Sequence, residues 1–102
     1  MTKINLSKFD PVDYLKSQEA IETYLQSALE TGDADHIASA ISDVIRAQGM
    51  LQTAKKTGID RSTLYHSFTS EGGNPRLSTL TKIINSLGLQ LSIKNKAIGA
   101  KT

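Results

Sequence analysis

Apolar residues recur along most of this chain at intervals of three and four positions, which is the period of an amphipathic α-helix. The clearest such segment runs from Ser17, a candidate N-cap, to about Glu30, with Ile21, Leu25 and Leu29 spaced four apart and Tyr24 and Ala28 alongside them. Most of the positions between them are polar. The pattern therefore predicts a helix with one buried face and one solvated face.

Capping residues mark the start of two neighbouring helical segments. Asp10-Pro11 is a helix-start signal, which predicts one short turn that presents Val12 or Tyr14 to the core. Asp33 is another candidate N-cap, and it begins a predicted helix over residues 34–48. The apolar face of that helix is expected to comprise Ile37, Ala38, Ile41, Val44 and Ile45.

The stretch from Met50 to Phe68 has the pattern of two short helices joined by a tight turn. Gly58 is placed to end the first helix in the left-handed conformation, and Asp60 is placed to cap the second helix with its carboxylate. Leu64 and Phe68 are spaced four apart among polar residues. One face of the second helix should therefore be buried while the other is exposed.

The C-terminal part combines one more helix with a change of period. After the turn-rich residues 69–75, Ser78 is expected to cap a helix over residues 79–87. Residues 89–94 then alternate apolar and polar side chains, which is the period of a β-strand. We expect a short C-terminal strand, followed by a flexible tail over residues 95–102.

A lone strand leaves a row of backbone groups unpaired unless another strand supplies partners. The same strand of a second copy, paired across a two-fold axis, would supply them. We therefore expect a homodimer whose interface contains Leu89, Leu91 and Ile93. Two alternatives remain, because the strand could dock on its own domain or complete the sheet of a different protein.

Length and composition bound the class of protein. A chain of 102 residues fits a single domain, divided into N-terminal helices over 9–48, a helical core over 49–88, the strand and the tail. The absence of cysteine excludes disulfides and thiolate metal sites. No stretch is long and apolar enough for a secretory signal or a membrane span, so we expect a cytoplasmic protein without membrane contact.

Charge divides the chain into two unlike halves. Residues 1–48 carry four Lys and Arg against eight Asp and Glu, a net −4, whereas residues 49–102 carry eight against two, a net +6. A basic half suits the phosphate backbone of nucleic acid, and an acidic half suits a basic protein. For the acidic half, ordinary solvated helix faces are an equally good explanation.

Ala54, Gly58, Ile59 and Leu64, followed by the run Asn74-Pro75-Arg76-Leu77-Ser78-Thr79-Leu80, stand at a distinctive spacing. This spacing resembles the helix-turn-helix of repressor-like (Xre/Cro-type) DNA-binding domains. The resemblance implies an all-α, five-helix, lambda-repressor-type fold, here with an N-terminal helical extension. The alternative is a plain helix hairpin in some other small bundle.

DNA readout requires side chains on the exposed face of the second helix that can bond base edges in the major groove. The candidates for base contacts are Arg61, Ser62, Thr63, Tyr65 and His66. Tyr65 could equally be a half-buried ring. The candidates for phosphate contacts are Gln52, Lys55, Lys56, Asn74 and Arg76, although any single lysine could be an ordinary surface charge.

The chain offers little for catalysis. Glu19 and Glu22 lie on one helix face without a segment that would form a pocket around them. His36 and His66 are on different helices and have no cysteine beside them, so a metal site is not expected. No glycine-rich phosphate loop follows a strand. We expect no enzyme activity, no cofactor and no metal.

Short matches to one subset of the repressor-like proteins are spread over residues 9–93, and they comprise Phe9-Asp10-Pro11, Asp13-Tyr14-Leu15, Tyr24-Leu25, Ala28-Leu29-Glu30, Gly32-Asp33, Gly49-Met50, Thr57-Gly58, Arg61, Leu64-Tyr65, Gly73-Asn74-Pro75 to Leu80, and Leu87-Gly88-Leu89. In these residues the chain resembles the addiction-module antidote proteins of bacterial toxin–antitoxin operons.

The resemblance implies an antitoxin that neutralises a small basic toxin, usually a RelE/ParE-like protein, and that binds double-stranded operator DNA to repress their shared operon. A stand-alone phage-type repressor is the alternative within the same fold. An adaptor that binds protein or RNA is the alternative from another class, although the chain lacks the interleaved aromatic residues of single-strand RNA readers.

Overall fold

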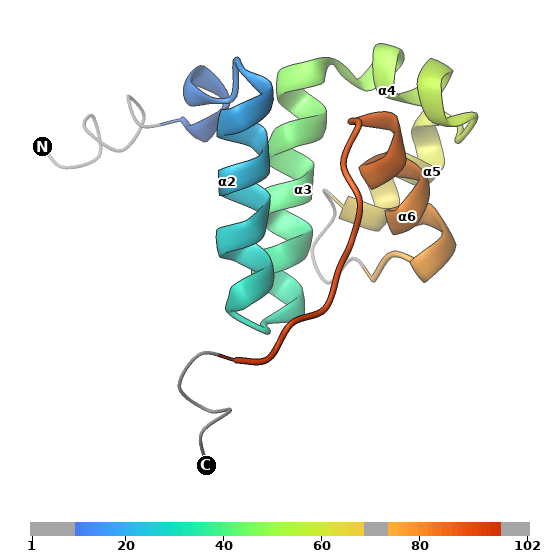
Figure 1. Cartoon of the computed structure of the whole chain (residues 1–102). Coiled ribbons are helices and arrows are strands. Elements are labelled where there is room, and N and C mark those ends of the chain that lie inside the picture. Colours follow the sequence, from blue (N-terminus) through green and yellow to red (C-terminus); the bar gives the residue numbers. More distant parts are fainter. Residues whose placement is uncertain (1–9, 69–73, 97–102) are drawn as a thin grey trace, which may run out of the picture.

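The computed structural model describes residues 10–68 and 74–96 as an arrangement of helices (Figure 1). Within these residues it contains the 3₁₀ turn η1 (Pro11–Tyr14) and five α-helices: α2 (Gln18–Glu30), α3 (Ala34–Gln48), α4 (Met50–Thr57), α5 (Arg61–Phe68) and α6 (Leu77–Ser86). The predicted all-α class and the number of helices are confirmed. Residues 69–73 of the predicted loop and the part of the predicted tail beyond residue 96 lie outside the described residues.

Helices α2 and α3 form an antiparallel pair at the N-terminal side of the molecule (Figure 1). Both begin at the predicted N-caps. The Ser17 hydroxyl accepts the N–H of Ala20 at 3.0 Å, and the Asp33 carboxylate accepts the N–H of Asp35 at 3.0 Å. Each cap satisfies one of the backbone donors that a helix start leaves unpaired.

The buried face of α2 differs from the predicted one at its C-terminal end. Ile21, Leu25 and Ala28 are buried, whereas Leu29 is 38% exposed. Two successive steps of four residues rotate a side chain by about 80° around a helix with 3.6 residues per turn. Leu29 has therefore turned away from the core, and the seven-residue spacing from Ile21 keeps Ala28 in it.

The turn before α2 also contributes a different residue from the one expected. Asp10 caps η1 by accepting the N–H of Val12 at 3.1 Å, as predicted. Tyr14 is 62% exposed, however, and Val12 is only partly buried. Leu15, which directly follows the turn, is the residue that enters the core.

Two glycines direct the chain between α3 and α5. Gly49, with φ at +99°, ends α3 and precedes α4, while Gly58, with φ at +79°, ends α4 in the left-handed conformation that was predicted. Residues that carry a Cβ atom rarely adopt such φ angles. The turn therefore positions Asp60, whose carboxylate accepts the N–H of Thr63 at 3.3 Å and begins α5.

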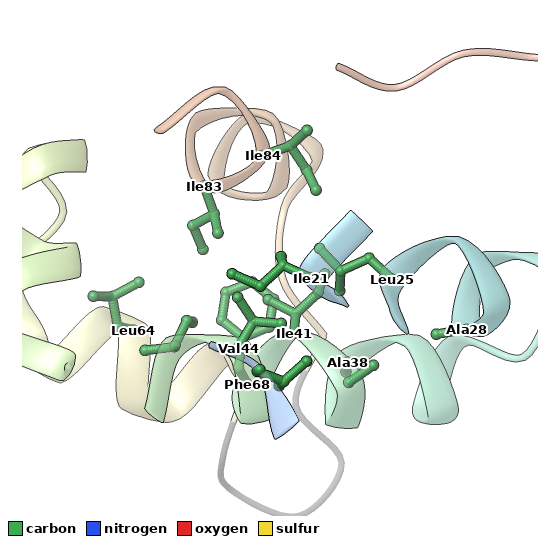
Figure 2. Packing of buried hydrophobic residues seen from close by; sticks show 13 residues of the cluster. Ile21, Leu25, Ala28, Ala38, Ile41, Val44, Leu64, Phe68, Ile83 and Ile84 are labelled. Carbon is green, nitrogen blue, oxygen red and sulfur yellow. The ribbon is translucent and has the colours of Figure 1, made fainter. Parts of the chain in front are cut away.

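The core is formed mainly by buried side chains of α2, α3, α5 and α6, and Figure 2 shows its side chains. Leu64 of α5 and Val44 of α3 are completely buried, and Ile83 of α6 is almost so. Burying one such side chain contributes roughly 1.5–3 kcal/mol. Phe68 is also buried, which confirms the predicted inner face of α5.

The start of α6 corrects one predicted cap. The helix begins at Leu77, with Arg76 at the N-cap position, and Arg76 forms no side-chain capping hydrogen bond. Ser78 lies inside the first turn instead, where its carbonyl accepts the Thr81 hydroxyl at 3.0 Å. The helix starts earlier because the N–H of Leu80 bonds to the carbonyl of Arg76 at 3.0 Å, so the helical hydrogen bonds begin two residues before Ser78.

The predicted C-terminal strand was wrong for the described residues, which contain no strand. The backbone N–H of Leu89 bonds to the carbonyl of Ile84 at 3.2 Å, and that of Gly88 bonds to Asn85 at 3.0 Å. These two bonds are the Schellman pattern that closes a helix. The residues that follow, up to 96, form neither helix nor strand (Figure 1), and no strand in the described part of the chain offers them partners.

Two long-range contacts attach the end of the chain to the α2–α3 pair. The Gln18 side-chain amide donates to the Leu87 carbonyl at 2.6 Å, which joins the start of α2 to the end of α6. Lys94 forms an exposed ion pair with Glu30 at 3.7 Å. Because exposed pairs contribute little, the Gln18 contact and the burial of Leu89 against the core are the stronger attachments.

A polar network joins η1, α2 and α3 at one side of the pair. Arg46 donates to Asp43 at 2.9 Å and to Asp10 at 3.2 Å, and the Tyr24 hydroxyl donates to the other oxygen of Asp43. Burial, and then the bond to Asp43, raise the pKa of Tyr24 to about 12. The bonds from Arg46 lower the pKa of the Asp10 carboxyl.

The raised pKa of Tyr24 predicts a loss of stability in alkali. The folded phenol keeps its proton up to about pH 12, whereas an unfolded tyrosine titrates near pH 10. The unfolded state therefore loses its proton first, so this contribution is complete below about pH 10 and disappears as the pH rises through about 12. Urea unfolding of the wild type and of Tyr24→Phe from about pH 9 to about pH 11.5 should show a shallower decline in the variant. Tyr14→Phe is the matched control, since Tyr14 is exposed, and an unchanged slope in Tyr24→Phe would contradict the assignment.

Candidate functional site

The outer face of α5 carries the side chains that were predicted to read bases. Arg61, Ser62, Thr63, Tyr65 and His66 are all exposed, while Leu64 and Phe68 hold the opposite face in the core. This arrangement follows from four-residue spacing, because both buried residues fall on one side of an eight-residue helix. The packing of α5 on α3 therefore presents its polar face to solvent.

Thr63 differs from the other four candidates. Its backbone N–H bonds to the Asp60 carboxylate at 3.3 Å, and its hydroxyl also bonds to that carboxylate. These bonds lower the pKa of Asp60, with the hydroxyl of Thr63 as the largest cause. Thr63 is thus engaged in capping the helix, whereas Arg61 and Ser62 at the first two helical positions have no such role.

A shallow depression of about 450 Å³ lies on this face, and it is lined by Met50, Arg61, Ser62, Tyr65 and His66. The rings of Tyr65 and His66 meet edge to face, with centroids 5.5 Å apart and planes at 80°. Four of the five lining residues are predicted base contacts. Met50, the first residue of α4, was not predicted to belong to the site.

One feature of the sequence bears on the position of Met50, although the predicted site did not include this residue. Gly49 ends α3 directly before it, so Met50 begins α4 at the turn between these two helices. Met50 is partly buried against the core and also lines the depression. Helical periodicity alone assigns an apolar residue such as Met50 to the core. It does not show which part of the side chain remains accessible to solvent.

The candidate phosphate contacts form two groups beside this face. Gln52, Lys55 and Lys56 are exposed on α4, and Asn74 and Arg76 are exposed immediately before α6. In the described part of the chain, no salt bridge involves the four cations Lys55, Lys56, Arg61 and Arg76. Their charges are therefore not neutralised by neighbouring carboxylates, which leaves them suited to an anionic partner.

A second, oppositely charged surface lies on α2. Glu19, Glu22, Gln26 and Glu30 are exposed, and their spacing of three or four residues places them along one side of the helix. The Gln26 amide donates to Glu30 at 3.5 Å. We call these four residues the acidic stripe. The helix that carries it, α2, lies across α3 from the α4–α5 pair (Figure 1).

The described residues contain no cluster of three or more metal-ligating side chains. None of the helices described is long and apolar enough to cross a membrane.

A family model described as probable addiction module antidote protein matches residues 5–95. The chain belongs to this family. An uncharacterised protein of Haemophilus influenzae is 36% identical over 89 residues, which cover 87% of this chain and 91% of that protein. No solved structure gave a match.

Membership of the antidote family confirms the antitoxin part of the resemblance that the sequence carried. The match covers η1 and all five α-helices, so both the acidic stripe and the exposed face of α5 belong to the part of the chain that the family shares. The family therefore implies a cognate toxin as partner.

Proposed function

We propose that this antidote protein is the antitoxin of a type II toxin–antitoxin module, and that it represses its own operon by binding operator DNA. The observation that supports DNA binding most directly is the exposed polar face of α5 beside the unpaired cations of α4. Family membership supports the antitoxin role.

In this proposal α4, the turn at Gly58–Asp60 and α5 act as a helix-turn-helix. The second helix of such a motif lies in the major groove, with its first residues against base edges. Arg61 and Ser62 occupy those positions in α5, and Arg61 has the geometry for two bonds to one guanine. Lys55, Lys56 and Arg76 would contact phosphates on either side, with Gln52 and Asn74 as neutral donors.

The acidic stripe is the surface that we propose for the toxin. A RelE/ParE-like toxin is basic, and a row of carboxylates on a solvated helix face would attract it and orient its approach. The same carboxylates would be repelled by DNA phosphates. The two proposed partners therefore require different surfaces of one chain.

The protein is further proposed to act as a homodimer, because a two-fold operator is bound by two copies about one helical turn apart. Ile93 is 97% exposed and Leu91 is 38% exposed, while Leu89 packs against its own core and anchors the segment. Leu91 and Ile93 together leave apolar surface exposed on one short segment, which favours a contact with another chain. Leu91 and Ile93 would supply that contact by their side chains.

Arg61→Ala should weaken binding to the promoter of the protein's own operon by roughly 5- to 150-fold and relax the preference at one base pair, as expected for the loss of a bidentate guanine contact. Lys55→Ala should weaken binding to all sequences alike and reduce the slope of log affinity against log salt by about 1. Titration of a labelled duplex by fluorescence anisotropy at several salt concentrations measures both effects. Lys82→Ala, a change of an exposed cation outside the predicted contacts, is the control. Equal losses for Arg61→Ala and Lys82→Ala would argue against base reading by α5.

The double substitution Glu19→Gln and Glu22→Gln should weaken toxin binding by about 3- to 30-fold at low salt, because two exposed charge pairs of modest strength are lost. Isothermal titration calorimetry with the protein encoded by the adjacent gene is the measurement. Leu51→Lys with Gln52→Lys changes the net charge by the same amount at exposed positions of α4, away from α2, and it should leave the affinity nearly unchanged. If the two double variants weaken toxin binding equally, the affinity depends on the net charge of the protein and the acidic stripe has no specific role.

Ile93→Asp should convert a dimer into a monomer in sedimentation velocity at tens of micromolar protein, since a carboxylate cannot be buried unpaired in an apolar contact. Ser92→Asp introduces the same charge at the neighbouring exposed position and should leave the dimer intact. A wild-type protein that sediments as a monomer would remove the dimer from the proposal.

A further inference from the structure

The depression on the outer face of α5 combines two kinds of chemistry. Arg61, Ser62 and His66 supply polar groups, whereas Met50 and Tyr65 supply a thioether and an aromatic ring. Tyr65 is 54% exposed, and its ring packs edge-on against the ring of His66. This contact restricts the tyrosine ring before any ligand arrives, which lowers the entropy lost on binding.

The open shape of the depression excludes a small-molecule site of the usual kind. Such sites enclose most of the ligand's surface. Here the four lining residues from α5 are all exposed, so a ligand would remain open to solvent on one side. A shallow surface of this type suits the edge of a larger partner, and on the proposed function that partner is the major groove of DNA.

The major groove presents only one apolar feature, the 5-methyl group of thymine. Met50 and Tyr65 are the lining residues that match it, because a thioether and a ring offer close contact without losing hydrogen bonds. Arg61 and Tyr65 are four residues apart on α5, which is about 6 Å along the helix axis. One base-pair step is about 3.4 Å, so a methyl against Tyr65 lies one or two steps from a base that Arg61 reads.

We propose that Met50 and Tyr65 form a contact for the methyl group of a thymine that lies one or two base pairs from the guanine read by Arg61. The inference rests on the proposed DNA binding and extends it, since it assigns a specificity-determining role to Met50, a residue of α4. The operator half-site then contains a guanine and a thymine at this separation.

The test begins with the full-length chain and a randomised double-stranded DNA library, from which bound duplexes are selected and sequenced. In the best duplex each thymine is then replaced by deoxyuridine, which removes the methyl group alone. Replacement at one position near the guanine should weaken wild-type binding about 4-fold, the loss of one buried methyl at about 0.8 kcal/mol. The same replacement should weaken the binding of Met50→Ala less, because part of the contact with the methyl group is already lost in that variant.

Leu51→Ala is the matched control, because Leu51 is a neighbouring exposed apolar residue of α4 that does not line the depression. It should keep the discrimination between thymine and uracil. Because Met50 also packs against the core, the wild-type comparison of the two duplexes carries the test without depending on the fold of a variant. Equal wild-type affinity for thymine and uracil at every position would overturn the inference and leave DNA binding in place. Failure to select or bind any duplex would overturn the proposed function and the inference with it.

Discussion

The packing of α3 against its neighbours is the constraint on which the other elements depend. Helix α3 contacts η1, α2, α4 and α5, and its buried residues Ala40, Ile41, Val44 and Ile45 extend around more than one side of the helix. One side meets α2, and another meets Leu64 and Phe68 of α5 (Figure 2). A helix with so wide an apolar surface can only be stable in the centre of a domain. The acidic and basic surfaces are consequently held on different sides of it.

The sequence predicted those parts of the fold that depend on local chemistry. The N-caps Ser17, Asp33 and Asp60, and the glycine turn at Gly58, each satisfy backbone groups within a few residues, so their signals are complete in the chain itself. The inner face of α5 was predictable for the same reason. Leu29 was misplaced because a four-residue repeat drifts around the helix over two turns.

The remaining errors concern residues whose structure depends on distant partners. Residues 89–94 have strand periodicity, but periodicity does not supply a neighbouring strand, and the N–H of Leu89 instead closes α6. The contact of Gln18 with Leu87 joins positions far apart in the sequence, so no local sequence pattern predicts it. Met50 illustrates the same limit at the candidate site. Its side chain was predictable as apolar, but its place beside Arg61 and Tyr65 follows from the way α4 and α5 pack.

The separation of the two charged surfaces has a consequence for how the proposed partners compete. Figure 1 places α2, which carries the acidic stripe, and α5 on different sides of α3, so we expect a toxin bound to α2 to leave Arg61 and Ser62 accessible. Exposed charges more than about 10 Å apart are largely screened at ordinary salt, so charge alone couples the two surfaces weakly. Stronger coupling would have to pass through contacts that span the molecule. One described contact with that property is the bond from Gln18, at the start of α2, to Leu87, at the end of α6. A toxin that shifts α2 would affect the half proposed to bind DNA most directly through that contact and through the core around α3.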